Sequence, residues 1–146
     1  MHTPTAQHGF TLIETLATMA IAAVLSGIAV PSFDAQLRKA RRADALTAVA
    51  QIQGAQERLR SRSTRYGDLA EIGAAAVSGA GHYGLQITAF GPDGYALLAT
   101  ATGPQARDTD CRVMRARAIG MNLVYESGAD ANVANDVAAN RRCWSL

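Results

Sequence analysis

A single carboxylate stands inside the longest apolar stretch of this 146-residue chain. No side chain from Thr15 to Phe33 carries a formal charge, and Glu14 directly precedes that run. An unpaired carboxylate in such surroundings costs several kcal/mol, so Glu14 requires a cationic partner. Cleavage of the Gly9–Phe10 peptide bond would release an α-amine about one helical turn from Glu14. These residues predict an amine–carboxylate pair that forms only after processing.

The apolar stretch is itself long enough to cross a bilayer, which takes roughly 20 mostly apolar residues in a helix. A secretory signal peptide is one alternative, but its apolar core is shorter and is followed by a small-residue cleavage site. A plain signal anchor is another, although it rarely carries a carboxylate at its apolar edge. Neither alternative explains the combination of Gly9 and Glu14.

The motif Gly9-Phe10-Thr11-Leu12-Ile13-Glu14 at the head of an apolar helix resembles the class III signal sequence of type IV pilins and pseudopilins. The resemblance implies that a prepilin peptidase removes residues 1–9 and that the new Phe10 amine is methylated. It also implies that Glu14 pairs with the amine of a neighbouring subunit during assembly. Pro31 falls where the family usually has a proline, and a helix kink is expected there.

Residues 10–33 are thus expected to be the transmembrane and assembly half of a helix, and residues 34–146 the periplasmic or extracellular domain. The net charge of +2 is too small to indicate a partner. The only two cysteines, Cys111 and Cys143, predict a disulfide in an exported domain. Closing that loop would stabilise the domain by roughly 3–4 kcal/mol in the chain-entropy model.

Periodicity predicts one long helix from Phe10 to about Arg62, interrupted near Gly27 and Pro31, with Asp34 capping its second part. A buried stripe is expected on that second part, formed by Ala45, Val49, Ile52, Gln56 and Leu59. The opposite, solvent-facing side is expected to hold Arg41, Arg42, Asp44, Thr47, Gln51 and Arg58.

A connecting region at 61–81, with a short helix at 68–76, leads to four strands expected at 82–90, 95–102, 111–118 and 121–126. On the first of them, Tyr83, Leu85, Ile87 and Ala89 are expected to share one face. Gly91-Pro92-Asp93-Gly94 predicts a turn between the first two strands. Four antiparallel strands against one long helix make an α+β roll.

The polar tail at 127–140 is expected to be a loop that the disulfide ties to the third strand. With the closing Cys143-Trp144, this arrangement resembles the disulfide-bounded loop of pilins, and the chain looks most like the PilE-type minor pilins over nearly its whole length. The resemblance implies a pilin fold and a structural subunit that primes or enters pilus filaments, for adhesion or twitching motility. The implied partners are other pilin subunits, the prepilin peptidase and the inner-membrane assembly machinery. The precursor would reside in the inner membrane and the mature subunit in the filament on the cell surface.

Enzymatic chemistry has little support in the sequence. Cleavage after Gly9 would leave His82 as the only histidine, which does not suffice for a histidine-based triad or metal site. Asp130, Asn132, Asn135 and Asp136 are spaced somewhat like calcium ligands, but they do not follow an EF-hand pattern and are more typical of turns. No enzyme activity, metal or cofactor is therefore expected.

Six arginines could gather near the disulfide: Arg107, Arg112, Arg115, Arg117, Arg141 and Arg142. A basic patch there could hold DNA phosphates, as in a competence pilin that takes up DNA. Pairing with Asp108, Asp110 and Asp136 is the favoured alternative, because the net charge is small and aromatic residues are not interleaved. A type II secretion pseudopilin is a further alternative, but such proteins generally lack the cysteine-bounded tail.

Overall fold

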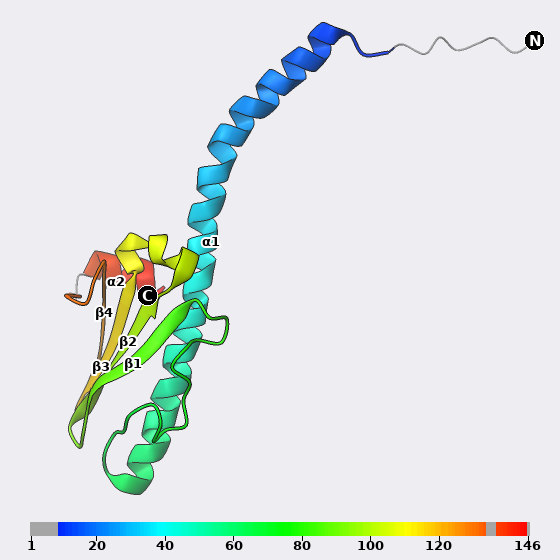
Figure 1. The fold of residues 1–146 in the computed structure, drawn as a ribbon. Coiled ribbons are helices and arrows are strands. Elements are labelled where there is room, and N and C mark those ends of the chain that lie inside the picture. Colours follow the sequence, from blue (N-terminus) through cyan, green and yellow to red (C-terminus); the bar gives the residue numbers. More distant parts are fainter. Residues whose placement is uncertain (1–8, 134–136, 146) are drawn as a thin grey trace, which may run out of the picture. The chain divides into compact units, whose positions relative to one another are not determined.

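The computed structural model describes residues 9–133 and 137–145, without the side chains of residues 29–31, 137 and 139. Residues 1–8 of the expected leader therefore lie outside the described residues. The helices are α1 (Leu12–Ser63) and α2 (Val137–Trp144), with short 3₁₀ helices η1 (Gly103–Arg107) and η2 (Thr109–Cys111). The strands are β1 (Tyr83–Phe90), β2 (Gly94–Ala101), β3 (Val113–Ile119) and β4 (Asn122–Gly128) (Figure 1).

The chain divides into two units, Met1–Leu37 and Arg38–Leu146. Helix α1 begins in the first unit and ends in the second. By length and composition α1 can cross a membrane, and its most apolar window is entirely exposed.

Helix α1 is unbroken from Leu12 to Ser63. Asp34 therefore lies inside the helix rather than at the start of a second one, and the expected capping role is wrong. The helix also runs through Gly27 and Pro31, so the interruption expected there is wrong. The expected kink at Pro31 stays a prediction.

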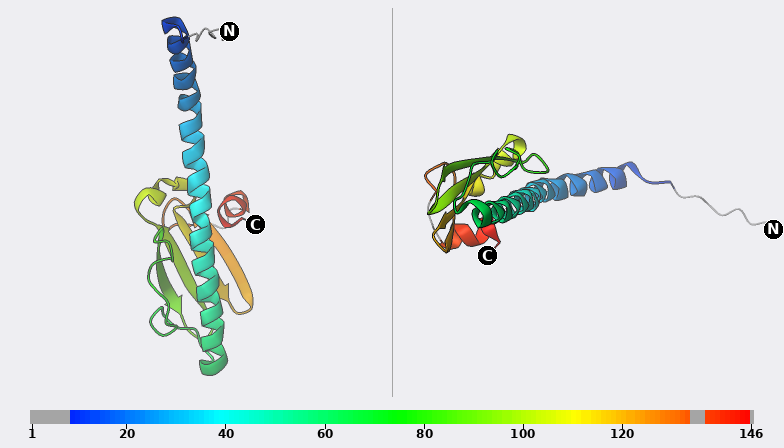
Figure 2. Two further views of the ribbon diagram at one scale, coloured as in Figure 1. Left: turned by 90° about the vertical axis from the view of Figure 1, so that its right-hand side faces the viewer. Right: turned by 90° about the horizontal axis from the view of Figure 1, so that it is seen from below.

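The hydrophobic core of the second unit lies between α1 and one face of the sheet (Figures 1 and 2). The expected helical stripe is confirmed, since Ala45, Val49, Ile52 and Gln56 are all buried, while Leu59 is half-buried. From the sheet, the core receives Tyr83, Leu85, Tyr95, Leu97, Ala99, Met114 and Ala116. Figure 2 shows α1 lying in front of the strands when the domain is viewed from the helix side.

The four strands form an antiparallel sheet in the order β1-β2-β3-β4, as expected from the sequence. Gly91 donates its backbone N–H to the carbonyl of Gly94 across the expected turn. Gly120, at φ 59°, begins the tight turn between β3 and β4. A register shift in β1 falls between Ile87 and Ala89. Because a bulge changes which residues face the core, Ala89 is exposed, and its expected place on the buried face is wrong.

The connecting region contains turns in place of the helix expected at 68–76. Ile72 and Ala74 donate to the carbonyls of Asp68 and Leu69, and Gly73 at φ 66° ends this turn. Further on, Asp44 of α1 accepts hydrogen bonds from the Ser78 hydroxyl and from the amides of Ala80 and His82. Asp44 therefore holds this loop, although solvent exposure was expected for it.

The predicted disulfide is confirmed, with Cys111 and Cys143 both fully buried. Cys111 lies in η2, just before β3, whereas the sequence indicated the strand itself. Cys143 lies in α2, which the sequence did not predict. The Asn140 side chain donates to the Tyr125 carbonyl, and the Trp144 Nε1–H donates to the Glu126 carbonyl. The helix is therefore attached to β4 by side chains and to η2 by the disulfide.

Candidate functional site

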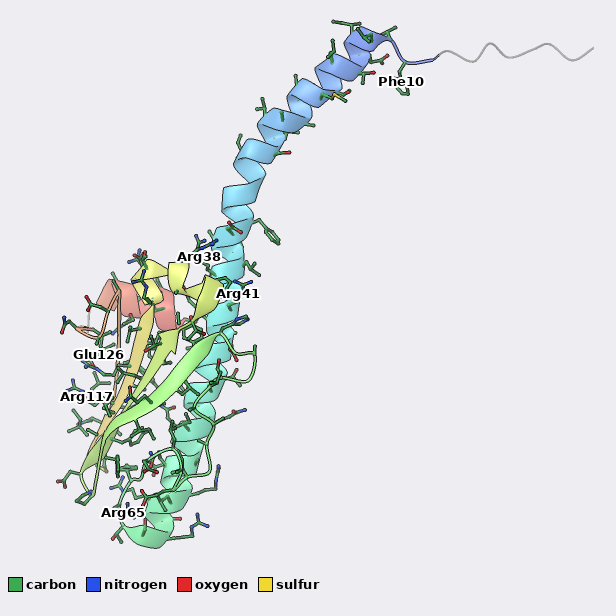
Figure 3. All side chains as sticks on the ribbon, in the orientation of Figure 1. Phe10, Arg38, Arg41, Arg65, Arg117 and Glu126 are labelled. Carbon is green, nitrogen blue, oxygen red and sulfur yellow. A yellow bond between two sulfur atoms is a disulfide. The ribbon has the colours of Figure 1, made fainter. Side chains whose placement is uncertain are left out.

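The start of α1 has a reciprocal cap that involves Glu14. The Glu14 amide donates to the Thr11 hydroxyl at 3.3 Å, and the Thr11 amide donates to the Glu14 carboxylate at 3.5 Å. This is the capping-box arrangement, which satisfies two amides at a helix start. Phe10 precedes the cap and is 87% exposed (Figure 3). In the uncleaved chain, Glu14 therefore makes a hydrogen bond within its own subunit.

The first half of α1 exposes apolar side chains on all sides of the helix. Its exposed large residues are Leu12, Ile13, Leu16, Met19, Ile21, Val24, Leu25, Ile28 and Phe33. A surface of this kind is stable only against lipid or against other apolar protein surface.

Two of the six arginines predicted to gather near the disulfide converge on one carboxylate. The Arg115 Nε donates to Glu126 at 2.6 Å, and an Arg117 NH2 group donates to the other oxygen at 3.2 Å. The Glu126 side chain is only 6% exposed. The Nε of Arg117 is buried without a hydrogen-bond partner among the described residues. Figure 3 labels Arg117 and Glu126 on the sheet.

The other four arginines do not converge on one partner, and Arg107 is exposed in η1. Arg112 donates to the carbonyl of Ala106, and Arg142 lies 3.8 Å from Asp110 in an exposed ion pair. Arg141 is exposed. The disulfide brings the flanks of the two cysteines together as expected. However, Arg115 and Arg117 of β3 both form ion pairs with Glu126, a residue that the sequence did not single out.

A second ion pair missed by the sequence analysis joins α1 to the segment before the disulfide. Arg42 donates two hydrogen bonds of 2.7 Å to Asp108 and one to the carbonyl of Arg142. The hydrogen bond to Asp108 raises the pKa of Arg42 above its ordinary value, although burial acts in the opposite direction. Asp108 had been expected to pair with the arginine patch. The third expected acidic partner, Asp136, lies outside the described residues.

Among residues 9–133 and 137–145, the structure contains no group of three histidine, cysteine, aspartate or glutamate residues able to hold a metal ion. The Asp130 side chain accepts a hydrogen bond from the Asn132 amide, as in an Asx turn. Asn135 and Asp136, the other two residues with calcium-like spacing, lie outside the described residues. His82 is half-buried and directly precedes β1.

Comparison with known proteins finds two family models along the chain. The model described as "Type IV minor pilin ComP, DNA uptake sequence receptor" matches residues 31–115. The model described as "Prokaryotic N-terminal methylation motif" matches residues 4–30. A relative, the type IV major pilin protein PilA of Myxococcus xanthus (strain DK1622), is 36% identical over 86 residues. That match covers 58% of this chain and 39% of the relative.

Proposed function

Because the chain belongs to the type IV minor pilin family, we propose that it enters a pilus filament after cleavage between Gly9 and Phe10. As a minor pilin it is a structural subunit whose partners are other pilins, the prepilin peptidase and the assembly machinery. The observation that carries the proposal is the exposed first half of α1, with Glu14 as its one charged side chain between Leu12 and Phe33. The precursor is then held in the inner membrane and the mature subunit in the filament.

In the proposed mechanism, Glu14 changes partner when the subunit leaves the lipid. The carboxylate caps its own helix through Thr11 in the precursor. Cleavage creates an α-amine at Phe10, and methylation leaves its charge in place. Glu14 then pairs with the amine of a neighbouring subunit inside a bundle of apolar helices. A buried ion pair contributes more to register than to net stability, so Glu14 would select the correct axial position of the subunit.

Processing is tested by changing the residue before the cut. We expect Gly9→Val to block cleavage, so that the chain recovered from cells keeps the mass of the precursor. Gly27→Ala is the matched control, because an added Cβ at this helical position meets nothing within 4 Å. Recovery of Gly9→Val at the mature mass would contradict the proposed cleavage site.

The role of Glu14 is tested by separating its charge from its hydrogen bond. Glu14→Gln can still accept from the Thr11 amide, because glutamine also serves in a capping box. It removes the charge, and we expect normal processing with loss of incorporation into sheared filaments, as for Glu14→Ala. Thr11→Ala removes the cap at a typical cost of about 1 kcal/mol but keeps the charge, so incorporation should persist. Normal incorporation of Glu14→Gln would exclude the charge pair.

DNA uptake is a second candidate function. The printed description of the family model that matches residues 31–115 favours it. The basic side chains suited to phosphate contact are Arg112 and Arg141, because Arg115 and Arg117 are engaged with Glu126. We expect salt-dependent retention of DNA by the full-length chain, weakened in Arg112→Gln/Arg141→Gln. Retention that is unchanged by this variant and by salt would argue against a role in DNA uptake.

The disulfide favours a pilus subunit over a secretion pseudopilin. Cys111 and Cys143 attach α2 to the start of β3, which gives the bounded tail typical of pilins. Sheared filaments that contain the mature chain would support this choice. Its presence only in a secretion complex would overturn it.

A further inference from the structure

Three basic residues begin the second unit of the chain, and the function proposed above does not use them. Arg38, Lys39 and Arg41 follow the charge-free run, and Arg38 is five residues after Phe33. None of the three belongs to an ion pair among the described residues, whereas the neighbouring Arg42 binds Asp108. We refer to Arg38, Lys39 and Arg41 as the basic collar.

The residues of the basic collar lie within about half of the circumference of α1. Counted at about 100° per residue, Lys39 lies roughly 100° and Arg41 roughly 300° around the helix from Arg38. Arg38 therefore shares the side of Ala45 and Val49, which are buried against the sheet, and the other two lie on opposite flanks. Lys39 is exposed, and Arg38 and Arg41 are half-buried; Figure 3 labels both arginines.

The position of the collar along the chain indicates its occupant. The collar directly follows the charge-free segment, at the point where a lipid headgroup layer is expected. The negative phosphates of such a layer complement the positive charge of the collar.

We propose that the basic collar binds the phosphates of anionic phospholipids in the leaflet through which α1 leaves the membrane. The inference rests on the proposed function, because it requires the precursor to reside in a bilayer. Positive charge on the exported side opposes the usual bias toward the cytoplasm. Phosphate contacts offset that bias, because basic residues beside an anionic surface are attracted to it within a Debye length. The collar fixes the depth of the precursor, and these contacts are released when the subunit is extracted.

The nearby acidic residues leave the collar in positive excess. Asp34 is the one carboxylate between Phe33 and Arg42 in the sequence, against the three collar residues. Beyond the collar, Asp44 is occupied by the Ser78 hydroxyl and by two loop amides. Asp108 is occupied by Arg42. The charge of the collar is therefore available to an anion from outside the chain.

The test reconstitutes the full-length chain in nanodiscs of phosphatidylcholine and phosphatidylglycerol and counts co-released lipids by native mass spectrometry. The test variant is Arg38→Gln/Lys39→Gln/Arg41→Gln. The matched control is Arg58→Gln/Arg62→Gln/Arg107→Gln, which removes the same charge at exposed positions elsewhere. The midpoint of unfolding is measured for each protein, and Lys39→Gln alone serves if the triple variant fails to fold.

The wild-type chain and the control should retain phosphatidylglycerol in preference to phosphatidylcholine. In the collar variant this preference should fall by a factor of at least about five, because one basic residue at an anionic surface contributes about that much. In 0.5 M salt the wild-type preference should shrink toward that of the variant.

Equal preference in the wild-type chain and the collar variant would overturn the inference while leaving the proposed function intact. Unchanged lipid preference with loss of DNA retention in the collar variant would overturn it in favour of nucleic acid. Failure of the wild-type chain to enter these mixed nanodiscs would overturn both the inference and the membrane-resident precursor.

Discussion

At the scale of single residues, the second unit depends on two carboxylates that accept several hydrogen bonds, the buried Glu126 and the half-buried Asp44. Glu126 lies between two arginines of β3, and Asp44 accepts three hydrogen bonds from one loop. A group of this kind contributes little net stability relative to an apolar replacement, but removal of one partner leaves the others uncompensated. Substitutions at these positions should therefore have larger effects than substitutions in exposed ion pairs.

Glu126→Gln should destabilise the chain by about 2–3 kcal/mol. Breaking a fully buried pair costs about 3–5 kcal/mol, and the smaller value reflects the partial exposure of the arginines. Arg117 is 41% exposed and Arg115 24% exposed. Arg142→Gln is the control, because both side chains of its pair with Asp110 are 65% exposed, and it should cost less than about 0.5 kcal/mol. Denaturant unfolding of the full chain in mild detergent measures both, and equal effects would contradict this account.

Asp44 should make stability depend on pH in the acid range. Burial raises the pKa of Asp44, but hydrogen bonds from the Ser78 hydroxyl and from the Ala80 and His82 amides outweigh it, so the pKa lies below its ordinary value. The unfolded chain therefore binds a proton first as the pH falls. The stabilisation is fully present above about pH 4, the ordinary pKa of aspartate, and is lost as the pH falls through the folded-state pKa.

Asp44→Asn should accordingly be less stable than the wild-type chain at pH 7. The NH2 group of asparagine is a donor, and it would replace a carboxylate oxygen that accepts hydrogen bonds from the loop. The difference in free energy of unfolding should narrow as the pH falls below about 4. Unfolding curves between pH 7 and pH 3 measure it. A difference that is constant across this range would show that Asp44 acts without its charge.

At the scale of elements, the sheet is held in register by close backbone approach at the turns. A Cβ added to Gly94, the first residue of β2, would lie 2.1 Å from the Ala118 carbonyl oxygen of β3. Gly120 donates its N–H to the Asp93 carbonyl, so the two hairpin turns are joined at the same end of the sheet. The glycine at the start of β2 is thus required by contact between strands.

Gly94→Ala should lower stability by about 3 kcal/mol, at or above the upper end for overpacking, because the clash is with backbone rather than with a movable side chain. Gly91→Ala is the matched control in the same turn, where an added Cβ meets nothing within 4 Å. Its effect should stay within about 0.5 kcal/mol. Thermal unfolding compares the two variants, and similar losses would mean that the turn rather than the strand contact sets the cost.

The elements that the sequence predicts correctly are those with strong local patterns. Alternation from Tyr83 to Ile87 and the Gly-Pro-Asp-Gly turn are enough to predict the first hairpin from the sequence alone. The bulge that exposes Ala89 carries no such pattern, since it depends on pairing with β2. Helix α2 was missed because its polar residues Asn140, Arg141 and Arg142 are also common in loops. Its attachment depends on contacts to Tyr125 and Glu126, which are distant in the sequence.

The candidate sites, too, could be predicted where the sequence has a local signal and not where they depend on distant contacts. Glu14 was identifiable because a charge in an apolar run is a local anomaly, and its role stays a prediction. The arginines of β3 were identifiable by type but not by partner. Their partner Glu126 stands opposite Arg115 in the strand register, and opposite charges on facing positions were the available signal. The expected strand boundaries place Arg115 and Glu126 on neighbouring strands, but sequence alone did not fix the register.

At the scale of the whole molecule, the two units have different sources of stability. The segment to Leu37 has an exposed apolar surface that lipid or other subunits must cover. The unit from Arg38 onward has its own core and a disulfide that spans 32 positions of sequence. Loss of the disulfide should therefore act on the second unit and leave the apolar surface of the first unchanged.

Cys111→Ser/Cys143→Ser should lower the free energy of unfolding of the second unit by about 3–4 kcal/mol, the chain-entropy value for a loop of this length. That is a large part of the roughly 5–15 kcal/mol that stabilises a domain, so α2 should detach first, despite the hydrogen bonds of Asn140 and Trp144.

Both cysteines are fully buried, so a reductant should reach the disulfide of the wild-type chain only when the domain unfolds locally. Wild-type chain unfolded and refolded with reductant should then match the variant. Membrane insertion should be the same for both. A loss below about 0.5 kcal/mol would show that the contacts of α2, rather than the covalent link, hold the C-terminal segment to β4.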